Sequence, residues 1–320
     1  MSRVLNRRMS SLRGNAASEA AAEILQRFSN KPISIRKQFL DANQQQLLSL
    51  TLGRTSLHNG VSIAESPPAI GTPVPPGYHL VYFLPTILEK DLGADGTDRT
   101  VNPLSPFTRR MWAGGELEWS QEPEKLLRVG QTVEEATNVL SAEPKKLKSG
   151  GEMIVVGVEK RFENENGIAL IDRRSWVYQP EITDKRLPPA IPAEAPFPEG
   201  RYVRDYIQTA VTLFRFSALT FNGHKIHYSP EWCRTVEGHR TCVVHGPLSL
   251  INILDLWRDN VASANAETVP KSISYRAMSP IYMDEKYRIV LENEGESDTT
   301  SKAEIWDSYG KIGMKGTITA

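Results

Sequence analysis

The feature that most constrains the fold is a period-two alternation of apolar and polar residues, which occurs in two separate parts of the chain. In the first part, residues 111–179, stretches rich in Val, Ile and Trp are separated by turn-forming residues at 148–151 and 164–167. Successive side chains of a strand point to opposite faces, so the alternation predicts half-buried strands, and the short turns predict antiparallel pairing. We therefore expect an antiparallel meander here.

The alternation returns after residue 272, in SISYRAM, KYRIVLE, SKAEIWD and GMKGTITA. Between the two parts lie residues 187–200, with five prolines in fourteen residues, a composition typical of a semi-rigid linker. Helices are predicted at 41–54 and 247–257, and a Gly-Pro pair opens the second, as expected because proline suits the first helical position. The pattern predicts two α+β units of similar architecture, although their sequences match only weakly.

Composition excludes several classes of function. The 38 basic residues balance 38 acidic ones, so the chain lacks the overall positive field of a nucleic-acid-binding protein. Its two cysteines, Cys233 and Cys242, form no CxxC pair and are expected to be reduced thiols. No apolar run reaches the roughly 18 to 20 residues of a membrane-spanning helix. We expect no membrane span, no metal and no cofactor.

The first residues differ from the rest of the chain. Residues 1–18 contain Arg3, Arg7, Arg8 and Arg13 together with several serines and alanines, and the first acidic residue is Glu19. This composition is typical of a mitochondrial transit peptide and predicts a location in the mitochondrial matrix. The alternative is a basic tail that directs the protein nowhere.

Histidines cluster in one part of the second half. Three of the six histidines lie within residues 219–228 and 243–247. Addition of water to an enoyl thioester needs a base for the water, a proton donor for the carbon that becomes an enolate, and hydrogen bonds to the thioester oxygen. A histidine can provide the first two in turn, and a free N–H at a helix N-terminus can provide the third.

At these residues the sequence resembles a known family. The stretches FRFSALTFNGHKIHYSPEWCRTVEG and VVHGPLSLINILDLWR resemble the MaoC-like, hydratase-2 branch of the hotdog superfamily. The resemblance is closest to the mitochondrial 3-hydroxyacyl-thioester dehydratases type 2 and the mesaconyl-type hydratases. In the first half, PPGYHLVYFLP, RRMWAGGELEW and LRVGQTVEE look like the degenerate N-terminal repeat of that family.

The resemblance implies an α+β double hotdog, in which two antiparallel sheets each wrap around a central helix. It would be an internal pseudo-dimer, with further oligomerisation left open. The expected divisions are a transit-like segment (1–30), a degenerate hotdog repeat (31–186), a Pro-rich linker (187–200) and a catalytic MaoC-like hotdog (201–320).

The resemblance also implies a set of site residues. The wider family has an aspartate, four residues and a histidine, and here Asn222 and His227 hold those positions. Because an amide does not accept a proton at neutral pH, His227 is the expected acid-base residue and Asn222 its polar partner. Gly246 matches the glycine whose N–H polarises the thioester carbonyl. The expected substrate-binding residues are Arg215, Phe221, Lys225, Tyr228 and His245.

The other histidines have weaker expectations. His224 is a candidate for a supporting role beside the motif, whereas His79 and His239 are expected to be structural. Arg258, like Arg215 and Lys225, is a candidate contact for phosphates of coenzyme A or a carrier-protein arm.

The resemblance implies dehydration of (R)-3-hydroxyacyl thioesters in mitochondrial type II fatty acid synthesis, with the acyl group on coenzyme A or acyl carrier protein. Hydration of a mesaconyl-type enoyl-coenzyme A is the alternative enzyme. A hotdog thioesterase or a non-catalytic acyl-binding protein stays open, because Asn222 replaces the acid of the wider family.

Overall fold

The computed structural model describes residues 16–147, 150–183, 188–262, 265–293 and 299–320. Ten strands form one antiparallel sheet in the order β1-β5-β6-β7-β4-β9-β12-β11-β10-β8. The first half contributes β1 (Ser34–Phe39), β4 (Arg109–Trp119), β5 (Thr132–Lys146), β6 (Glu152–Asn164) and β7 (Gly167–Gln179). The second half contributes β8 (Tyr202–Ile207), β9 (Ser272–Ala277), β10 (Lys286–Asn293), β11 (Thr300–Asp307) and β12 (Ile312–Thr319). A small hairpin of β2 (Ser56–His58) and β3 (Val61–Ser62) lies apart.

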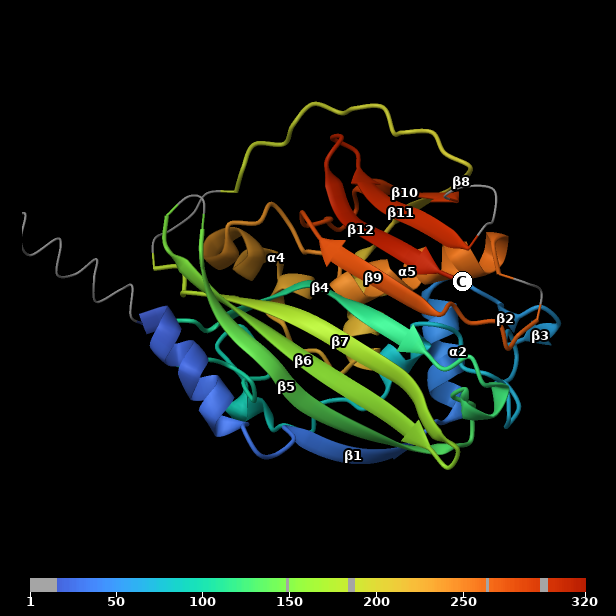
Figure 1. Ribbon diagram of the computed structural model, residues 1–320. Helices are drawn as coiled ribbons and strands as arrows, with labels where there is room; N and C mark the ends of the chain where they lie inside the picture. The colour runs from blue at the N-terminus through green and yellow to red at the C-terminus, as the bar shows by residue number, and fades with distance from the viewer. Residues whose placement is uncertain (1–15, 148–149, 184–187, 263–264, 294–298) are drawn as a thin grey trace, which may run out of the picture.

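The two halves have the same strand order. Counted from its outer edge, each half places its first strand beside its third, followed by its fourth, fifth and second. The second strands, β4 and β9, pair antiparallel, so the halves meet as one continuous sheet (Figure 1). The double hotdog is therefore confirmed. The two halves match only weakly in sequence, but their shared strand order shows that they are repeats of one architecture.

Strands β4 to β7 and β9 to β12 lie where the alternation predicts them. Helix α2 (Ala42–Thr51) lies within the helix predicted at 41–54. The edge strands β1 and β8, each six residues long, lie outside the stretches of alternation described above. The remaining elements are α3 (Ala210–Leu219), α4 (Pro230–Trp232), α5 (Gly246–Asn260), the 3₁₀ turns η1 (Tyr78–Val81), η2 (Glu89–Asp91), η3 (Pro123–Lys125) and η4 (Lys225–His227), and the π-helical turn η5 (Cys233–Glu237).

The halves differ in their central helix. In the second half the helix predicted at 247–257 is α5, fifteen residues long, with proline in its first turn. In the first half the segment between β1 and β4 forms α2, the hairpin of β2 and β3, and the short 3₁₀ turns η1 and η2. The place of the expected central helix of the first half is taken by η1, which packs beside α5: a Cβ on Gly77 would lie 2.9 Å from Leu254.

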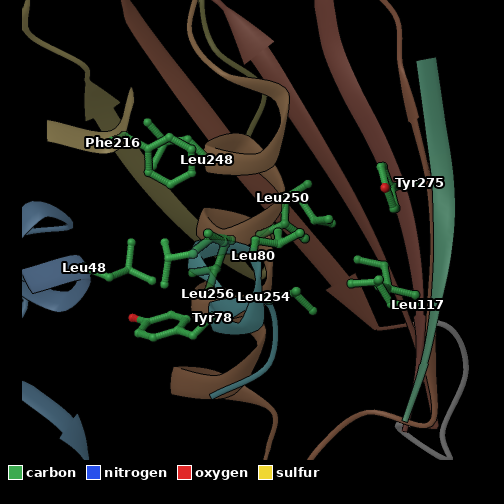
Figure 2. Packing of buried hydrophobic residues seen from close by; sticks show 14 of the residues in the cluster. Leu48, Tyr78, Leu80, Leu117, Phe216, Leu248, Leu250, Leu254, Leu256 and Tyr275 are labelled. Carbon is green, nitrogen blue, oxygen red and sulfur yellow. The ribbon is translucent and has the colours of Figure 1, made fainter. Parts of the chain in front are cut away.

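The main core surrounds α5. Every residue from Leu248 to Trp257 is buried, so this helix has no solvent-facing side over three turns. Figure 2 shows its leucines between Tyr78 and Leu80 on one side and Leu117 and Tyr275 of the central strands on the other. Continuous apolar contact on both sides fixes the direction of α5, and hence the place where its N-terminus lies.

Residues 16–27 form a helix that packs on β6, on the same face of the sheet as Lys160 and Phe162, which line the cavity between the two halves. Ala17, Ala20 and Ile24 are buried against Ile154 and Val156 in a second apolar cluster. Removal of residues 1–30 would expose this face of the sheet. The expected transit-like segment, residues 1–30, includes this helix, and its residues 1–15 lie outside the described residues.

Residues 188–200 have no regular secondary structure and pass outside the sheet, over the strands of the second half (Figure 1). Both cysteines are free and buried. Across the residues that the structure describes, no helix is long and apolar enough to cross a membrane, and no group of three or more potential metal ligands occurs.

Candidate active site

A cavity of about 1050 Å³ lies between the two halves. Its second-half wall consists of the loop after α3, the start of α5 and the segment after β9. Its first-half wall consists of η1 and strands β1 and β4 to β7. The motif residues Asn222, His227 and Gly246 all line it. The structure thus brings the three expected catalytic residues to one cavity.

The loop after α3 is shaped by its own sequence. Phe221 has a positive φ of 47°, and the Asn222 N–H donates to the Ser217 carbonyl at 2.8 Å, which ends the helix. Asn222 Oδ1 then accepts the His224 N–H at 3.1 Å, and this turn leads into η4 and His227. The Asn-Gly pair is therefore a turn former, and the turn places His227 on the cavity wall.

His227 is held by one hydrogen bond. Its Nδ1 lies 2.8 Å from the Val243 carbonyl, which can only accept, so Nδ1 carries the proton. The other nitrogen, Nε2, therefore has a lone pair. Burial lowers the pKa of His227 to about 4, although the bond to Val243 acts in the opposite direction. His227 is a neutral base at pH 7.

His245 lies behind His227. The two rings stack with centroids 3.6 Å apart, and His245 Nε2 lies 2.9 Å from the Ser217 hydroxyl. His245, one of the expected substrate-binding residues, is fully buried, and the structure does not bring it to the cavity wall. Burial and the neighbouring His227 lower the pKa of His245, which keeps the stacked pair uncharged. His245 supports the His227 ring from behind.

The N-terminus of α5 opens beside the same cavity. Gly246 is its first residue, and within the described chain its N–H has no acceptor. A Cβ on Gly246 would lie 3.4 Å from the Trp112 ring of β4, so this first-half side chain closes the cavity on that side. A free N–H at the positive end of a fifteen-residue helix is suited to a partly negative oxygen.

A first-half turn supports the motif loop from outside. Lys225 donates from its N–H to the Asp95 carbonyl at 2.8 Å, and its Nζ donates to the Ala94 carbonyl at 2.7 Å. His224 Nε2 lies 3.8 Å from the Asp95 carboxylate. Gly96 has φ +83°, and a Cβ there would lie 2.0 Å from the Gly223 carbonyl oxygen. Only glycine allows the two turns to approach this closely.

Two of the expected substrate-binding residues, Phe221 and Tyr228, line the cavity and are partly exposed. Lys225 does not line it, because its amine is bonded to the first half, and Arg215 is exposed on α3 away from it. Arg258 also lies elsewhere, bonded to Asp255.

The structure adds cavity residues that sequence reasoning did not assign. His79 and His239, expected to be structural, both line the cavity, and so does His224. Charged side chains of the first half also line it. The charged residues Arg36, Lys160 and Arg174 lie in strands. The alternation in a strand shows which residues share a face, but it does not show which face of the sheet meets the other half of the chain.

The fold places the chain in the class of double-hotdog proteins, and comparison with known proteins narrows this further. The sequence profile described as hydroxyacyl-thioester dehydratase type 2 matches residues 77–283. The chain belongs to that family, whose members share the MaoC-like hotdog resemblance found in the sequence.

Two relatives and one solved structure agree. A protein named mesaconyl-C(4)-CoA hydratase, from Chloroflexus aurantiacus, is 28% identical over 231 residues, 72% of this chain and 78% of its own. A mitochondrial hydroxyacyl-thioester dehydratase type 2 from Schizosaccharomyces pombe is 24% identical over 244 residues, 70% and 79% of the two chains. The crystal structure of a MaoC-like dehydratase from Phytophthora capsici has a TM-score of 0.64 at 14% identity, over 91% and 96%, which shows the fold alone.

The Gly96 contact gives a test of how the first half positions the site. We expect Gly96→Ala to lower kcat/KM for an enoyl thioester at least about tenfold, because a displacement near 1 Å can cost a hundredfold. Gly71→Ala is the control, since Gly71 has φ +87° and no atom near its Cβ position. Equal rates for both folded variants would contradict this role.

Proposed function

We propose that this protein catalyses the reversible hydration of 2-enoyl thioesters, with His227 as the base. In the dehydration direction the substrate is an (R)-3-hydroxyacyl thioester and the product a trans-2-enoyl thioester. The observation that carries the proposal is the protonation of His227: its Nδ1 is committed to Val243, so Nε2 can accept a proton in a cavity that Gly246 also lines. Membership of a dehydratase family supports it.

The hydration step balances with these groups alone. His227 Nε2 takes a proton from water, and the water oxygen bonds to C3 of the enoyl group. The electrons of the C2–C3 double bond move to the thioester oxygen, which gains negative charge and accepts the Gly246 N–H. When the carbonyl re-forms, protonated His227 gives its proton to C2. Dehydration follows the same path in reverse.

Asn222 has a separate part. Its Oδ1 already accepts the His224 N–H, and its amide Nδ2 makes no hydrogen bond within the described residues. An Nδ2–H donor is suited to hold the oxygen of the attacking water or of the 3-hydroxyl group. Asn222 thus orients that oxygen, and His227 alone transfers the proton.

For the metabolic role we propose mitochondrial type II fatty acid synthesis, with the acyl group on coenzyme A or acyl carrier protein. The basic N-terminus and the Schizosaccharomyces pombe relative, which is named as mitochondrial, support this location. A reporter fused to residues 1–30 should enter mitochondria, and replacement of its four arginines by glutamate should abolish entry. A reporter that is cytosolic without the replacements would contradict the location.

A mesaconyl-type hydratase is the second candidate. The Chloroflexus aurantiacus relative carries that name. The first-half cavity wall also carries His79, Lys160 and Arg174, which suits a polar acyl group better than a long alkyl chain. The two candidates share the chemistry at His227 and differ in the acyl group.

The mechanism predicts unequal effects at the two motif residues. His227→Ala should lower the hydration rate by about 10² to 10⁴, the usual contribution of general acid-base catalysis. Asn222→Ala should cost less. Asn222→Asp should stay active and change the pH profile, because a second ionising group then couples to His227. The measurement is kcat/KM with crotonyl-CoA for each variant.

His58→Ala is the matched control, because His58 also bonds a backbone carbonyl, at 2.8 Å, but does not line the cavity. It should leave the rate within about threefold of wild type, against the expected loss of 10² or more at His227. A folded His227→Ala protein with the rate of the His58→Ala protein would exclude His227 as the base.

The lowered pKa of His227 predicts an unusual acid limb. A base with a pKa near 4 is deprotonated above that pH, so kcat/KM should change less than about twofold from pH 7.5 to 5.5, whereas an ordinary histidine would lose about tenfold. The pKa values of all six histidines are lowered, mainly by burial, so stability falls as pH drops from 6.5 towards 4. Circular dichroism at each pH separates unfolding from titration. A folded protein that loses activity with an apparent pKa near 6.5 would contradict the assignment.

A further inference from the structure

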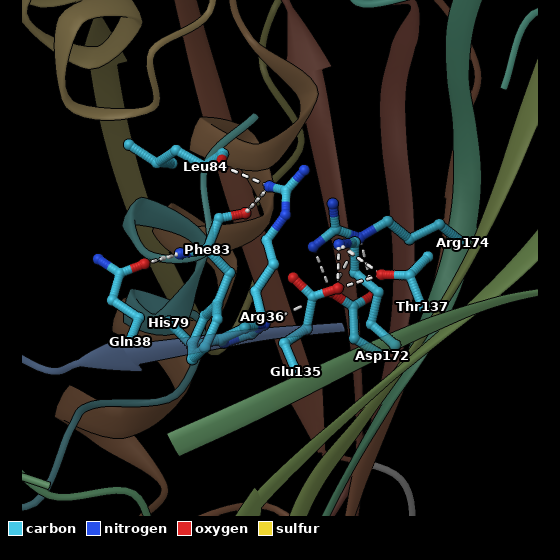
Figure 3. A network of polar contacts seen from close by, with 10 residues as sticks. Arg36, Gln38, His79, Phe83, Leu84, Glu135, Thr137, Asp172 and Arg174 are labelled. Carbon is cyan, nitrogen blue, oxygen red and sulfur yellow. Dashed lines mark hydrogen bonds and ion pairs between the residues drawn. The ribbon is translucent and has the colours of Figure 1, made fainter. Parts of the chain in front are cut away.

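The first-half wall of the cavity carries positive charge. Arg36 of β1, Lys160 of β6 and Arg174 of β7 all line the cavity. Figure 3 shows Arg36 and Arg174 extending into the same region, above Glu135 and Asp172. The two carboxylates are fully buried and do not line the cavity. Within this cluster the cationic groups therefore face the cavity and the two carboxylates lie behind them, while Glu89 and Asp98 line another part of the first-half wall.

The charges in this cluster do not cancel. Lys160 Nζ pairs with Glu135 at 2.9 Å, and Arg174 Nε donates to both oxygens of Asp172 at 3.0 and 2.9 Å. Arg36 instead donates from Nη1 to the carbonyls of Phe83 and Leu84. Across the described ranges no carboxylate pairs with it. Two ion pairs and one extra guanidinium leave this cluster with one positive charge.

Hydrogen-bond donors also remain unused. Arg36 Nε and Nη2, and Arg174 Nη1, make no hydrogen bond within the part of the chain that is described. His79 contributes no charge, because burial lowers its pKa and Asp172 at 3.4 Å raises it only in part. Guanidinium groups with free N–H donors match the geometry of a carboxylate.

The cluster lies one aromatic ring away from the thioester position. A Cβ on Gly246 would lie 3.4 Å from Trp112, and the Arg174 guanidinium lies over the same ring, 5.0 Å from its centroid. Trp112 therefore separates the group that polarises the thioester from the positive wall. A short acyl chain can bridge this separation, whereas a long alkyl chain would have to place methylenes against charged groups.

We propose that Arg36 and Arg174 form a subsite for a carboxylate at the far end of a short acyl chain, so that the preferred substrates are thioesters of dicarboxylic acids. This inference rests on the hydratase chemistry proposed above and, of the two candidate roles, favours the mesaconyl-type hydratase over fatty acid synthesis. A group with one extra positive charge and free donors, facing a cavity, is completed by an anionic ligand.

The test compares binding of succinyl-CoA and butyryl-CoA by isothermal titration. These saturated thioesters cannot be hydrated, and they differ only in a carboxylate or a methyl group at the chain end. Wild type should bind succinyl-CoA at least about tenfold more tightly, the usual value of a charge-assisted hydrogen bond. Arg36→Met should remove most of that preference, and Arg36→Lys, which keeps the charge, should retain part of it.

Lys37→Met is the matched control, because Lys37 is the next residue of β1, 71% exposed, and paired with Glu134 outside the cavity. It should leave both affinities unchanged. Tighter binding of butyryl-CoA by wild type would overturn the proposal. So would equal weakening of both ligands in Arg36→Met, which would mean that Arg36 contacts a coenzyme A phosphate.

Failure of the proposed function has a different signature. If fumaryl-CoA and crotonyl-CoA are both left unhydrated while succinyl-CoA still binds through Arg36, the carboxylate subsite stands and the hydratase proposal falls. If the protein hydrates crotonyl-CoA but binds succinyl-CoA no more tightly than butyryl-CoA, the hydratase proposal stands and the carboxylate subsite falls.

Discussion

The antiparallel pairing of β4 with β9 is the interaction on which the rest of the structure depends. It joins two five-stranded units into one sheet and sets the first-half wall opposite the second-half motif. The pairing needs close backbone contact: a Cβ on Gly114 would lie 2.4 Å from the Tyr275 carbonyl, and one on Gly115 would lie 2.1 Å from the Arg173 carbonyl. Two adjacent glycines allow the strands on both sides of β4 to approach.

The two halves differ in what packs against the concave side of the sheet, and this difference creates the cavity. In the second half α5 fills the concave side of the sheet and presents its N-terminus to the cavity. In the first half η1 takes up less space, and the cavity extends over β5 to β7. In the proposed mechanism the second half supplies the catalytic groups, and the first half supplies the wall that an acyl chain meets. The short turn η1 leaves room in the first half for a cavity of this size.

Much of the fold could be predicted from the sequence, because alternation and turn residues are local properties. Strands β4 to β7 and β9 to β12, and the helices α2 and α5, follow from such patterns. Asn222, His227 and Gly246 were found because a long motif carries them. The apolar run of α3 has no period that separates helix from strand, so the sequence does not predict its conformation.

What the sequence could not predict depends on the way the halves meet. His245 and Gly246 are neighbours in the same motif. Gly246 lines the cavity, whereas the His245 ring points away from it and stacks behind His227. Arg36 and Arg174 lie 138 positions apart, in strands β1 and β7. Only the sheet topology brings them to one wall of the cavity. Gly96 is an ordinary turn glycine in the sequence, and its contact with Gly223 exists only in the assembled fold.

The central claim is that this chain adds water to an enoyl thioester at one site built by both halves. The most direct measurement incubates the purified protein with crotonyl-CoA and follows the enoyl absorbance together with free thiol. For a hydratase, we expect that the absorbance falls to an equilibrium value, that no thiol appears, and that 3-hydroxybutyryl-CoA is the product. Release of thiol with the double bond intact would contradict it and identify a thioesterase instead.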